Sequence, residues 1–331
     1  MRRYILQSVL LIFGCILLQA QDNTATSGFR AYYPIHQKPS IGYLSSMNNF
    51  ETILFDAKPV VYYSFANNIG KRLQDSTYTN AHALYTVFEP QIRMYNEESL
   101  PVKTPSYRVA LGYQFLKKTT DTNFYALSFE TGHFSNGQSG CTFANGLTDE
   151  TDACIAAHAL ITDDSDLSSL LNRENGNFST NWTKLTLNYR FNVFRDNNKP
   201  RVAHSLFAGW EYYHNNLLWF FDIGGFSDFD LSVFGRSRLR LGYEFIHTFS
   251  GSVRYSAEFN MEYITNPHPF VDPVRAELRG IFYPGNLDFG VYINFVTGHD
   301  NYNYRLVDSG TQAGIGIIWD WFPPLDRPGL R

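Results

Sequence analysis

The amino-acid sequence predicts an all-β protein, a transmembrane antiparallel β-barrel of about twelve strands. Apolar and polar residues alternate with a period of two in segment after segment, which is typical of strands with one apolar face. Aromatic residues make up 17% of the chain and charged residues only 18%. In a barrel, aromatic girdles at both membrane interfaces account for this composition. After residue 20, no stretch approaches the roughly 18 consecutive apolar residues of a spanning helix.

The first 20 residues predict export. Residues 1–20 read as a signal peptide, with Arg2 and Arg3 at its start and Ala20 at the expected cut. Cys15 leaves a lipoprotein open, because residues 11–15 loosely resemble a lipid-attachment box. We assign residues 21–44 to an N-terminal segment, 45–322 to the barrel and the Pro-rich residues 323–331 to a C-terminal tail. The expected location is the bacterial outer membrane, reached through the periplasm.

Several predicted strands have clearly distinct faces. In residues 183–193 the odd positions are apolar after Thr183, whereas all even positions are polar. Residues 312–322 alternate in the same way and end in aromatic side chains. We expect the apolar faces to meet lipid and the polar faces to line a narrow lumen. In residues 107–115 and 238–249, the polar face carries charges of both signs that could pair and plug this lumen: Arg108, Arg238, Arg240 and Glu244.

Charge, cysteines and histidines narrow the possible functions. The net charge of -4 gives no argument for a nucleic-acid partner. Cys141 and Cys154 lie in one polar segment of an exported chain, which favours a disulfide that pins a loop. The remaining histidines have no metal-ligand spacing and read as interfacial or loop residues: His158, His204, His214 and His247.

The predicted strand that begins at residue 123 carries the strongest chemical signal. His133 and Ser135 fall on its apolar, outward face, two residues apart, where an imidazole can take a hydroxyl proton. Gly137 follows directly, permits a sharp turn and has an amide that can face an oxyanion. Spacing alone leaves a second interpretation open, because a His and a Ser near a strand end are more often polar residues of the membrane interface.

The motif resembles the His-x-Ser-Asn-Gly signature of the outer-membrane phospholipase A family: His133-Phe134-Ser135-Asn136-Gly137. Further segments are similar to that family in the same order along the chain. They are Asp56-Ala57-Lys58 in the first strand, Phe88-Glu89-Pro90-Gln91, and residues 291–322 with Val296-Thr297-Gly298.

The resemblance implies a barrel of about twelve strands that cleaves phospholipid acyl esters, is activated by Ca²⁺ and acts as a homodimer. By its motif, Ser135 is the nucleophile, His133 the base and Gly137 the oxyanion amide. Gln138 would contact Ca²⁺ through its backbone carbonyl, and Ser179 through its hydroxyl.

Two departures from the family pattern matter. The family has an Asn directly after its Trp to orient the histidine, whereas this chain has Thr183 after Trp182. The Thr183 hydroxyl can accept the imidazole N–H, and Asn181 on the same face is the alternative. Residues 139–177 are an insertion with an acidic cluster, which reads as a solvated loop or else as a lid or further calcium site: Asp163, Asp164 and Asp166.

Three hypotheses follow. The first is a calcium-dependent phospholipase A, a carboxylic ester hydrolase that acts on outer-membrane phospholipid. The second is a non-catalytic barrel of the same descent, porin-like or an adhesin. The third keeps the chemistry but changes the substrate to a lipid A or lyso-phospholipid ester.

Overall fold

The computed structural model describes residues 33–320, except 49, 75–76, 99–100, 121–122, 195–199, 250–252, 285–286 and 288. The predicted signal peptide with Cys15 and the predicted tail 323–331 lie outside the described residues. Among the described helices, none has the length and apolar character needed to cross a membrane.

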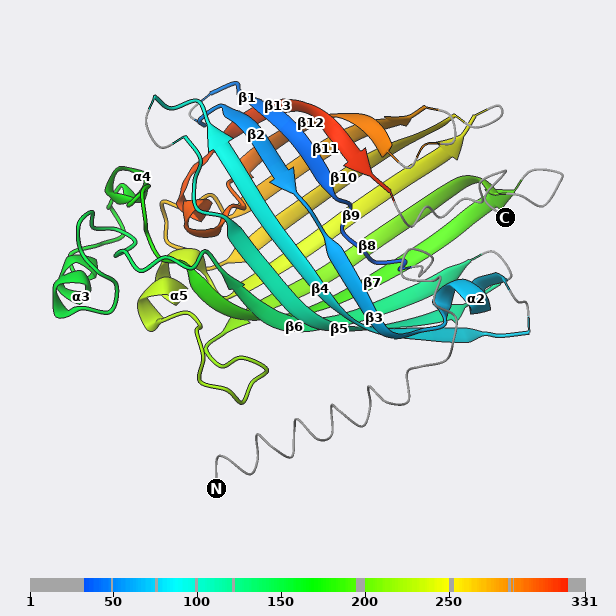
Figure 1. Cartoon of the computed structure of the whole chain (residues 1–331), viewed down its shortest axis with the longest axis horizontal. Coiled ribbons are helices and arrows are strands. Elements are labelled where there is room, and N and C mark those ends of the chain that lie inside the picture. The colour runs from blue at the N-terminus through cyan, green and yellow to red at the C-terminus, as the bar shows by residue number, and fades with distance from the viewer. Residues whose placement is uncertain are drawn as a thin grey trace.

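One antiparallel sheet contains the thirteen strand segments found among the described residues, and β1 closes it by pairing with both β13 and β2 (Figure 1). The first six are β1 (Ser40–Ser46), β2 (Ile53–Lys58), β3 (Val61–Asn67), β4 (Asn80–Tyr95), β5 (Ser106–Lys118) and β6 (Phe124–Ser135). The others are β7 (Ser179–Phe194), β8 (Pro200–His214), β9 (Ser237–Thr248), β10 (Arg254–Thr265), β11 (Val274–Tyr283), β12 (Phe289–His299) and β13 (Ser309–Trp319).

The strands β2 and β3 are two halves of one interrupted strand. Both pair with β4, β2 along its second half and β3 along its first half. Pro59 lies between them and has no N–H to donate to a ladder. Counted as one, they make the sheet a closed barrel of twelve strands, which confirms the predicted fold class.

The two faces of the wall follow the predicted alternation. On β7, Leu185 and Leu187 are more than 40% exposed, whereas their neighbours Asn188 and Arg190 are buried inside. Closure pairs the backbone groups of the wall, and the apolar exterior can therefore face hydrocarbon. A closed barrel with this apolar exterior and a polar interior is the form of bacterial outer-membrane proteins.

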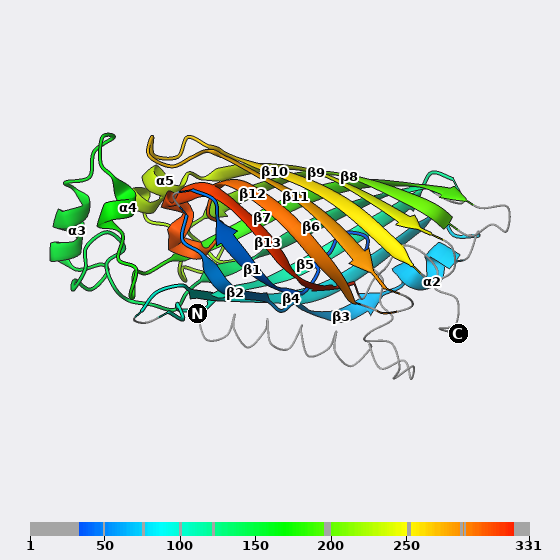
Figure 2. The same cartoon turned by 90° about the horizontal axis from the view of Figure 1, so that it is seen from above.

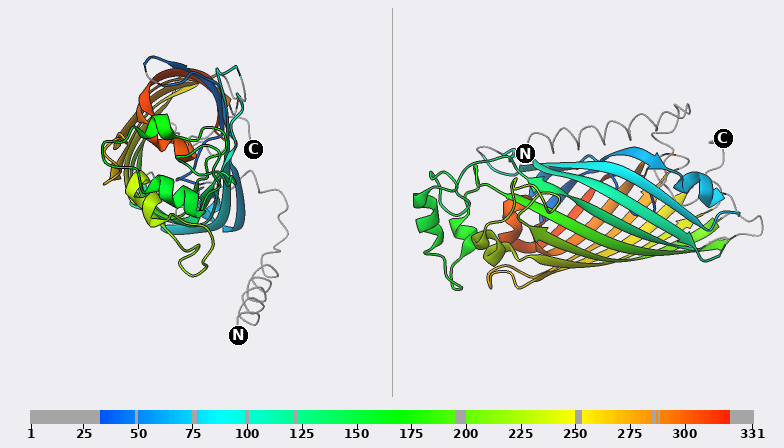
Figure 3. Two further views of the ribbon diagram at one scale, coloured as in Figure 1. Left: turned by 90° about the vertical axis from the view of Figure 1, so that its left-hand side faces the viewer. Right: turned by 90° about the horizontal axis from the view of Figure 1, so that it is seen from below.

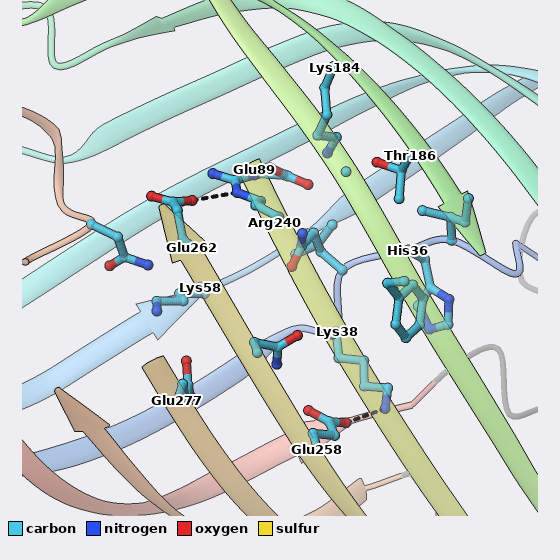
Figure 4. A pocket seen from close by; sticks show the side chains of 18 of the residues that line it. His36, Lys38, Lys58, Glu89, Lys184, Thr186, Arg240, Glu258, Glu262 and Glu277 are labelled. Atoms are coloured by element: carbon cyan, nitrogen blue, oxygen red, sulfur yellow. Dashed lines mark hydrogen bonds and ion pairs between the residues drawn. The ribbon is translucent and has the colours of Figure 1, made fainter. Parts of the chain in front are cut away.

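The lumen is filled by paired charges. Glu211 accepts from Arg108 at 2.9 Å and from Arg240 at 2.8 Å, and Lys184 pairs with Glu130 at 2.5 Å. A cavity of about 400 Å³ remains in the lumen, and Figure 4 shows charged side chains from opposite walls that line it. The interior therefore has the paired charges that the sequence predicted for a narrow lumen.

Residues 33–39, which directly precede β1, lie inside the barrel. Lys38 reaches Glu244 on β9 and pairs with Glu258 on β10 at 2.6 Å. The backbone N–H of Ile35 donates to the Gln114 side chain at 3.2 Å, and His36 lines the same cavity. The first strand begins at Ser40, within the segment 21–44 that the sequence assigned to an N-terminal segment before the barrel.

The two ends of the barrel differ (Figure 2). One end has short connections and α2 (Ile69–Gln74). The other has the long loops with α3 (Asp152–His158), α4 (Leu167–Leu170), α5 (Asp228–Phe234) and the 3-10 helix η1 (Asn303–Val307). Outer-membrane barrels have short periplasmic turns and longer extracellular loops, so the long-loop end is the extracellular one.

The insertion 139–177 is a folded cap at the extracellular end. It contains the Cys141–Cys154 disulfide, as the sequence predicted. Its buried Phe143 and Leu167 belong to the same apolar cluster as Phe234 of α5. Of the acidic residues, Asp166 caps α4 by accepting from Ser169 N at 3.1 Å, while Asp163 and Asp164 are exposed.

We predict that Cys154→Ser loosens the insertion and leaves the barrel folded. The disulfide closes a loop with a sequence separation of 13 residues, for which chain-entropy models give about 3 kcal/mol. The variant should be cleaved faster by trypsin at Arg173, and it should keep the gel mobility of a folded barrel. Loss of the folded-barrel mobility would contradict the prediction.

Candidate functional site

Strand β6 presents His133 and Ser135 outward at its extracellular end. Both side chains are half-buried and share a face with the exposed Leu127 and Phe129. In the ladder with β7, His133 lies opposite Asn181 and Ser135 lies opposite Ser179. The outward direction that the alternation predicted for the pair is the one in the structure.

On the lumen side, one guanidinium backs both strands of the site. Phe134 lies between His133 and Ser135 in sequence and points inward, as does Trp182 of β7. The Arg108 guanidinium carbon lies 4.9 Å from the Phe134 ring centre and 4.5 Å from that of Trp182. Arg108 therefore stacks behind β6 and β7 at the level of the site.

Asn181 holds the imidazole. Its side-chain N–H groups donate to the backbone carbonyls of Asn215 at 2.7 Å and Ile223 at 2.8 Å. This arrangement turns its Oδ1 toward His133, whose Nδ1 lies 2.9 Å away. Because a carboxamide oxygen only accepts, Nδ1 of His133 is the donor in this hydrogen bond, and Nε2 is not used by it.

Thr183 has a different role from the one the sequence predicted. Its hydroxyl oxygen accepts from the Trp219 indole at 3.0 Å and lies 3.0 Å from His214 Nε2 and 3.0 Å from the Thr131 hydroxyl. His133 instead bonds Asn181, its direct partner in the ladder. Of the two residues that the sequence left open, Asn181 and not Thr183 is therefore the one hydrogen-bonded to His133 in the structure.

The side chains of His133 and Ser135 lie on one face of β6, two residues apart, and are not hydrogen-bonded to each other. Alternate residues on one strand face have Cα atoms about 6.6 Å apart. Within the part of the chain that the structure describes, neither His133 Nε2 nor the Ser135 hydroxyl has a hydrogen-bond partner. A proton could pass between them only after a side-chain rotation that brings the two groups within hydrogen-bond reach.

The turn after β6 offers a free amide. Gly137 is exposed with a φ of 65°, a backbone conformation that favours glycine, and its N–H has no acceptor among the described residues. The Asn136 side chain fixes this turn. Its Oδ1 accepts from Gln138 N at 3.2 Å and from Phe178 N at 3.0 Å.

The residues predicted to bind Ca²⁺ offer oxygen atoms on neighbouring segments. Asn136 ties the turn that holds Gln138 to Phe178, the residue before Ser179. A hydroxyl and a carbonyl suit a hard cation, but Ca²⁺ takes six to eight oxygens. Among the described residues, no group of three acidic or histidine side chains joins this pair. The fit is therefore that of a cation that shares its other ligands with water, lipid or a second chain.

Sequence reasoning missed the segment between β8 and α5, residues 215–226. A Cβ added at Gly224 would lie 2.6 Å from His133 Cε1 and 3.0 Å from the Ser179 hydroxyl oxygen. This backbone therefore covers the site so closely that only glycine fits. The one available signal was the apolar run 217–221, which is unusual in a connection between strands.

The other histidines take local roles. His158 lies 3.3 Å from the Cys141 sulfur and stacks on Phe229 at 3.8 Å. Burial lowers the pKa of His158, an effect that the Asp149 carboxylate opposes. Cys141, Cys154 and His158 lie close enough to hold a metal, but the disulfide consumes both thiols. His204 and His247 contact aromatic rings.

Comparison with known proteins places the fold. The outer membrane phospholipase A from Escherichia coli matches with a TM-score of 0.51 and 14% identity, over 89% of this chain and 96% of that chain. The Salmonella typhi outer membrane phospholipase dimer with bound calcium matches with a TM-score of 0.49 and 14% identity. This match covers 93% of this chain and 98% of that chain. LpxR from Salmonella typhimurium matches with a TM-score of 0.39 and 11% identity, over 86% of this chain and 100% of that chain. No family model matches the chain, and no curated protein matches its sequence.

We predict that Asn181 sets the tautomer of His133. In the wild type, ¹⁵N shifts of labelled imidazole in micelles should show the proton on Nδ1. Asn181→Ala removes the acceptor and should abolish this preference. Thr183→Val is the matched control on the same face and should leave the tautomer unchanged. A change in the Thr183 variant alone would return the orienting role to Thr183.

Proposed function

We propose that the protein is a calcium-dependent phospholipase A that hydrolyses acyl esters of outer-membrane phospholipids. The observation that carries the proposal is the imidazole of His133, which Asn181 holds with its basic nitrogen free, beside Ser135 on the outer wall. A polar pair on a surface that faces lipid is costly unless it serves a function. The resemblance of the His133–Gly137 motif to the phospholipase A family supports the same reaction.

The chemistry follows from the residue types. His133 Nε2 takes the Ser135 proton while the hydroxyl oxygen attacks the acyl carbonyl. The Gly137 N–H donates to the oxygen that becomes negative. The ester bond to glycerol then breaks, and His133 returns the proton to the leaving oxygen. Water, activated by the same nitrogen, next releases the fatty acid and restores Ser135.

Asn181 acts through His133. As a neutral partner it fixes the tautomer and ring direction, and it stabilises the imidazolium only weakly in comparison with a carboxylate. The ester is reached from the plane of the membrane, because both side chains leave the barrel sideways and not toward the lumen.

Calcium enters the proposal through the oxygens of Ser179 and Gln138. A bound Ca²⁺ would supply positive charge beside the reacting ester. The few protein ligands imply that a second chain or the lipid completes the coordination, and we propose a homodimer as the active form. The motif resemblance, in which both calcium and dimerisation belong to the family, supports this part.

A non-catalytic barrel is the alternative. It is favoured by the absence of a hydrogen bond between His133 and Ser135 in the structure. A porin-like function conflicts with the lumen, where Lys38 bridges Glu244 and Glu258 and the charged side chains of opposite walls pair.

Purified protein in mixed micelles with Ca²⁺ should release fatty acid from phospholipid, and Ser135→Ala should reduce the rate about a thousandfold or more. The reason is loss of the only nucleophile in the proposed reaction. Ser139→Ala, at an exposed position in the adjoining turn, is the control and should retain activity. Release that persists in the Ser135 variant would exclude the proposed chemistry.

The conductance of the barrel tests the alternative. In planar bilayers we expect no steady channel for the wild type. Lys38→Glu places a third carboxylate against Glu244 and Glu258, and the repulsion should expel the segment and raise conductance. Lys38→Met keeps the apolar stem and should conduct less than Lys38→Glu. A large steady conductance of the wild type, without esterase activity, would favour the porin-like function.

A further inference from the structure

The connection of residues 215–226, here called the aromatic loop, leaves the barrel wall sideways. Figure 3 shows it as the yellow-green loop that extends beyond the outline of the barrel, next to α5. Its tip is a narrow hairpin in which Leu217 N donates to Phe221 O at 2.8 Å and Phe221 N donates to Leu217 O at 3.0 Å. Phe220 at the tip is 86% exposed, and Trp219, Phe221 and Ile223 are exposed as well.

The base of the aromatic loop is fixed to the outer wall. Trp219 stacks on His214 at 4.2 Å and donates to Thr183 on β7. Both ends of the loop accept hydrogen bonds from Asn181, through the carbonyls of Asn215 and Ile223. The loop is therefore a braced projection with an apolar tip.

The backbone at the tip is strained. Leu218 and Trp219 have φ values of 52° and 68°, a region that bulky side chains rarely adopt. Such conformations persist only where surrounding contacts hold them, and they gather at functional sites. Here the docking of Trp219 on the wall holds the turn and directs Phe220 away from the protein.

The base of the loop also covers polar groups that would otherwise meet lipid. Asn181 and Thr183 belong to the outward set of β7, yet both are buried. Outward polar atoms in hydrocarbon are costly without partners. The loop supplies those partners, and by doing so it aligns the amide that holds His133.

We propose that the aromatic loop is seated in the outer leaflet, where its tip binds phospholipid acyl chains and guides the ester to His133 and Ser135. Membrane seating stands independently, whereas delivery to the pair rests on the proposed phospholipase function. Trp and Phe side chains are favoured at the boundary between the lipid headgroups and the acyl chains. The apolar tip continues the lipid-facing surface formed by Leu185 and Trp210.

A second copy of the chain fits the tip less well. A stable protein interface buries about 800 Å² on each partner, usually over a broad complementary surface. The tip is a turn of only five residues, 217–221, of which Trp219 is docked on the wall and Phe220 is the most exposed. Asp222 is the sole charged residue between residues 215 and 226, so the aromatic loop has few charged groups that could orient a protein partner.

The first experiment locates the tip without reference to activity. Cys141 and Cys154 are paired, so in the mature chain Phe220→Cys introduces a single thiol for an environment-sensitive fluorophore. Leu160→Cys, which is 80% exposed just after α3, is the matched control. In phosphatidylethanolamine and phosphatidylglycerol vesicles, nitroxides on the acyl chains should quench the label at 220 several-fold more than the label at 160.

Equal quenching at 220 and 160 would overturn membrane seating. Shielding of the label at 220 that rises with the protein-to-lipid ratio, together with disulfide-linked dimers of Phe220→Cys, would assign the tip to a second copy and also overturn the proposal.

The second experiment tests delivery of substrate. Phe220→Gln should raise KM for vesicle phospholipid about tenfold and leave kcat within about twofold, because it removes only binding of the chain. Hydrolysis of a short-chain monomeric ester should stay within about twofold, and Leu160→Gln should match the wild type on both substrates. An equal loss on both substrates would overturn chain binding by the tip.

The two proposals fail in different ways. A quenched label at 220 in a protein without Ser135-dependent release supports membrane seating and overturns the phospholipase function together with substrate delivery. An active enzyme with an unquenched label retains the function and overturns the role of the loop.

Discussion

Closure of the sheet is the constraint on which the rest of the structure depends. A wall in hydrocarbon must pair its own backbone groups, and β1 provides this by joining β13 on one side and β2 on the other. Once the sheet is closed, every strand has one face toward lipid and one toward the lumen. The period-two pattern, the paired charges inside and the apolar exterior are consequences of that closure.

The candidate site departs from this rule at one place. At the extracellular ends of β6 and β7, the outward positions hold His133, Ser135, Asn181 and Thr183 instead of apolar side chains. The chain accommodates them by folding residues 215–226 over the wall, so that Asn181 and Thr183 are buried and hydrogen-bonded. Ser135 and His133 are only half-buried, whereas Asn181 and Thr183 beside them are fully buried.

The sequence pattern predicted the features that depend on local periodicity. The outward set of β7, the inward Arg108 and Arg240, and the disulfide of the exported insertion could all be read from the chain. The position of Lys38 inside the barrel could not be predicted from the sequence. Lys38 lies in a short segment with no strand pattern, and its carboxylate partners are more than 200 residues away along the chain.

The choice between Thr183 and Asn181 shows the same limit within the site. Both lie on the outward face, and the motif resemblance favoured the residue directly after Trp182. The ladder register places Asn181 opposite His133, and register depends on pairing across the 139–177 insertion. The partners that align the Asn181 amide, Asn215 and Ile223, come from a third segment with no recognisable motif.

Arg108 connects the two environments that the wall separates. Its guanidinium stacks on Phe134 and Trp182, whose outward neighbours in sequence are the residues of the candidate site, and it pairs with Glu211 inside the lumen. The outward side chains of the candidate site are thus backed by a cation on the lumen side of the wall. The wall is a single sheet at this point, so the guanidinium of the lumenal ion pair and the outward side chains of the candidate site lie on opposite faces of the same two strands, β6 and β7.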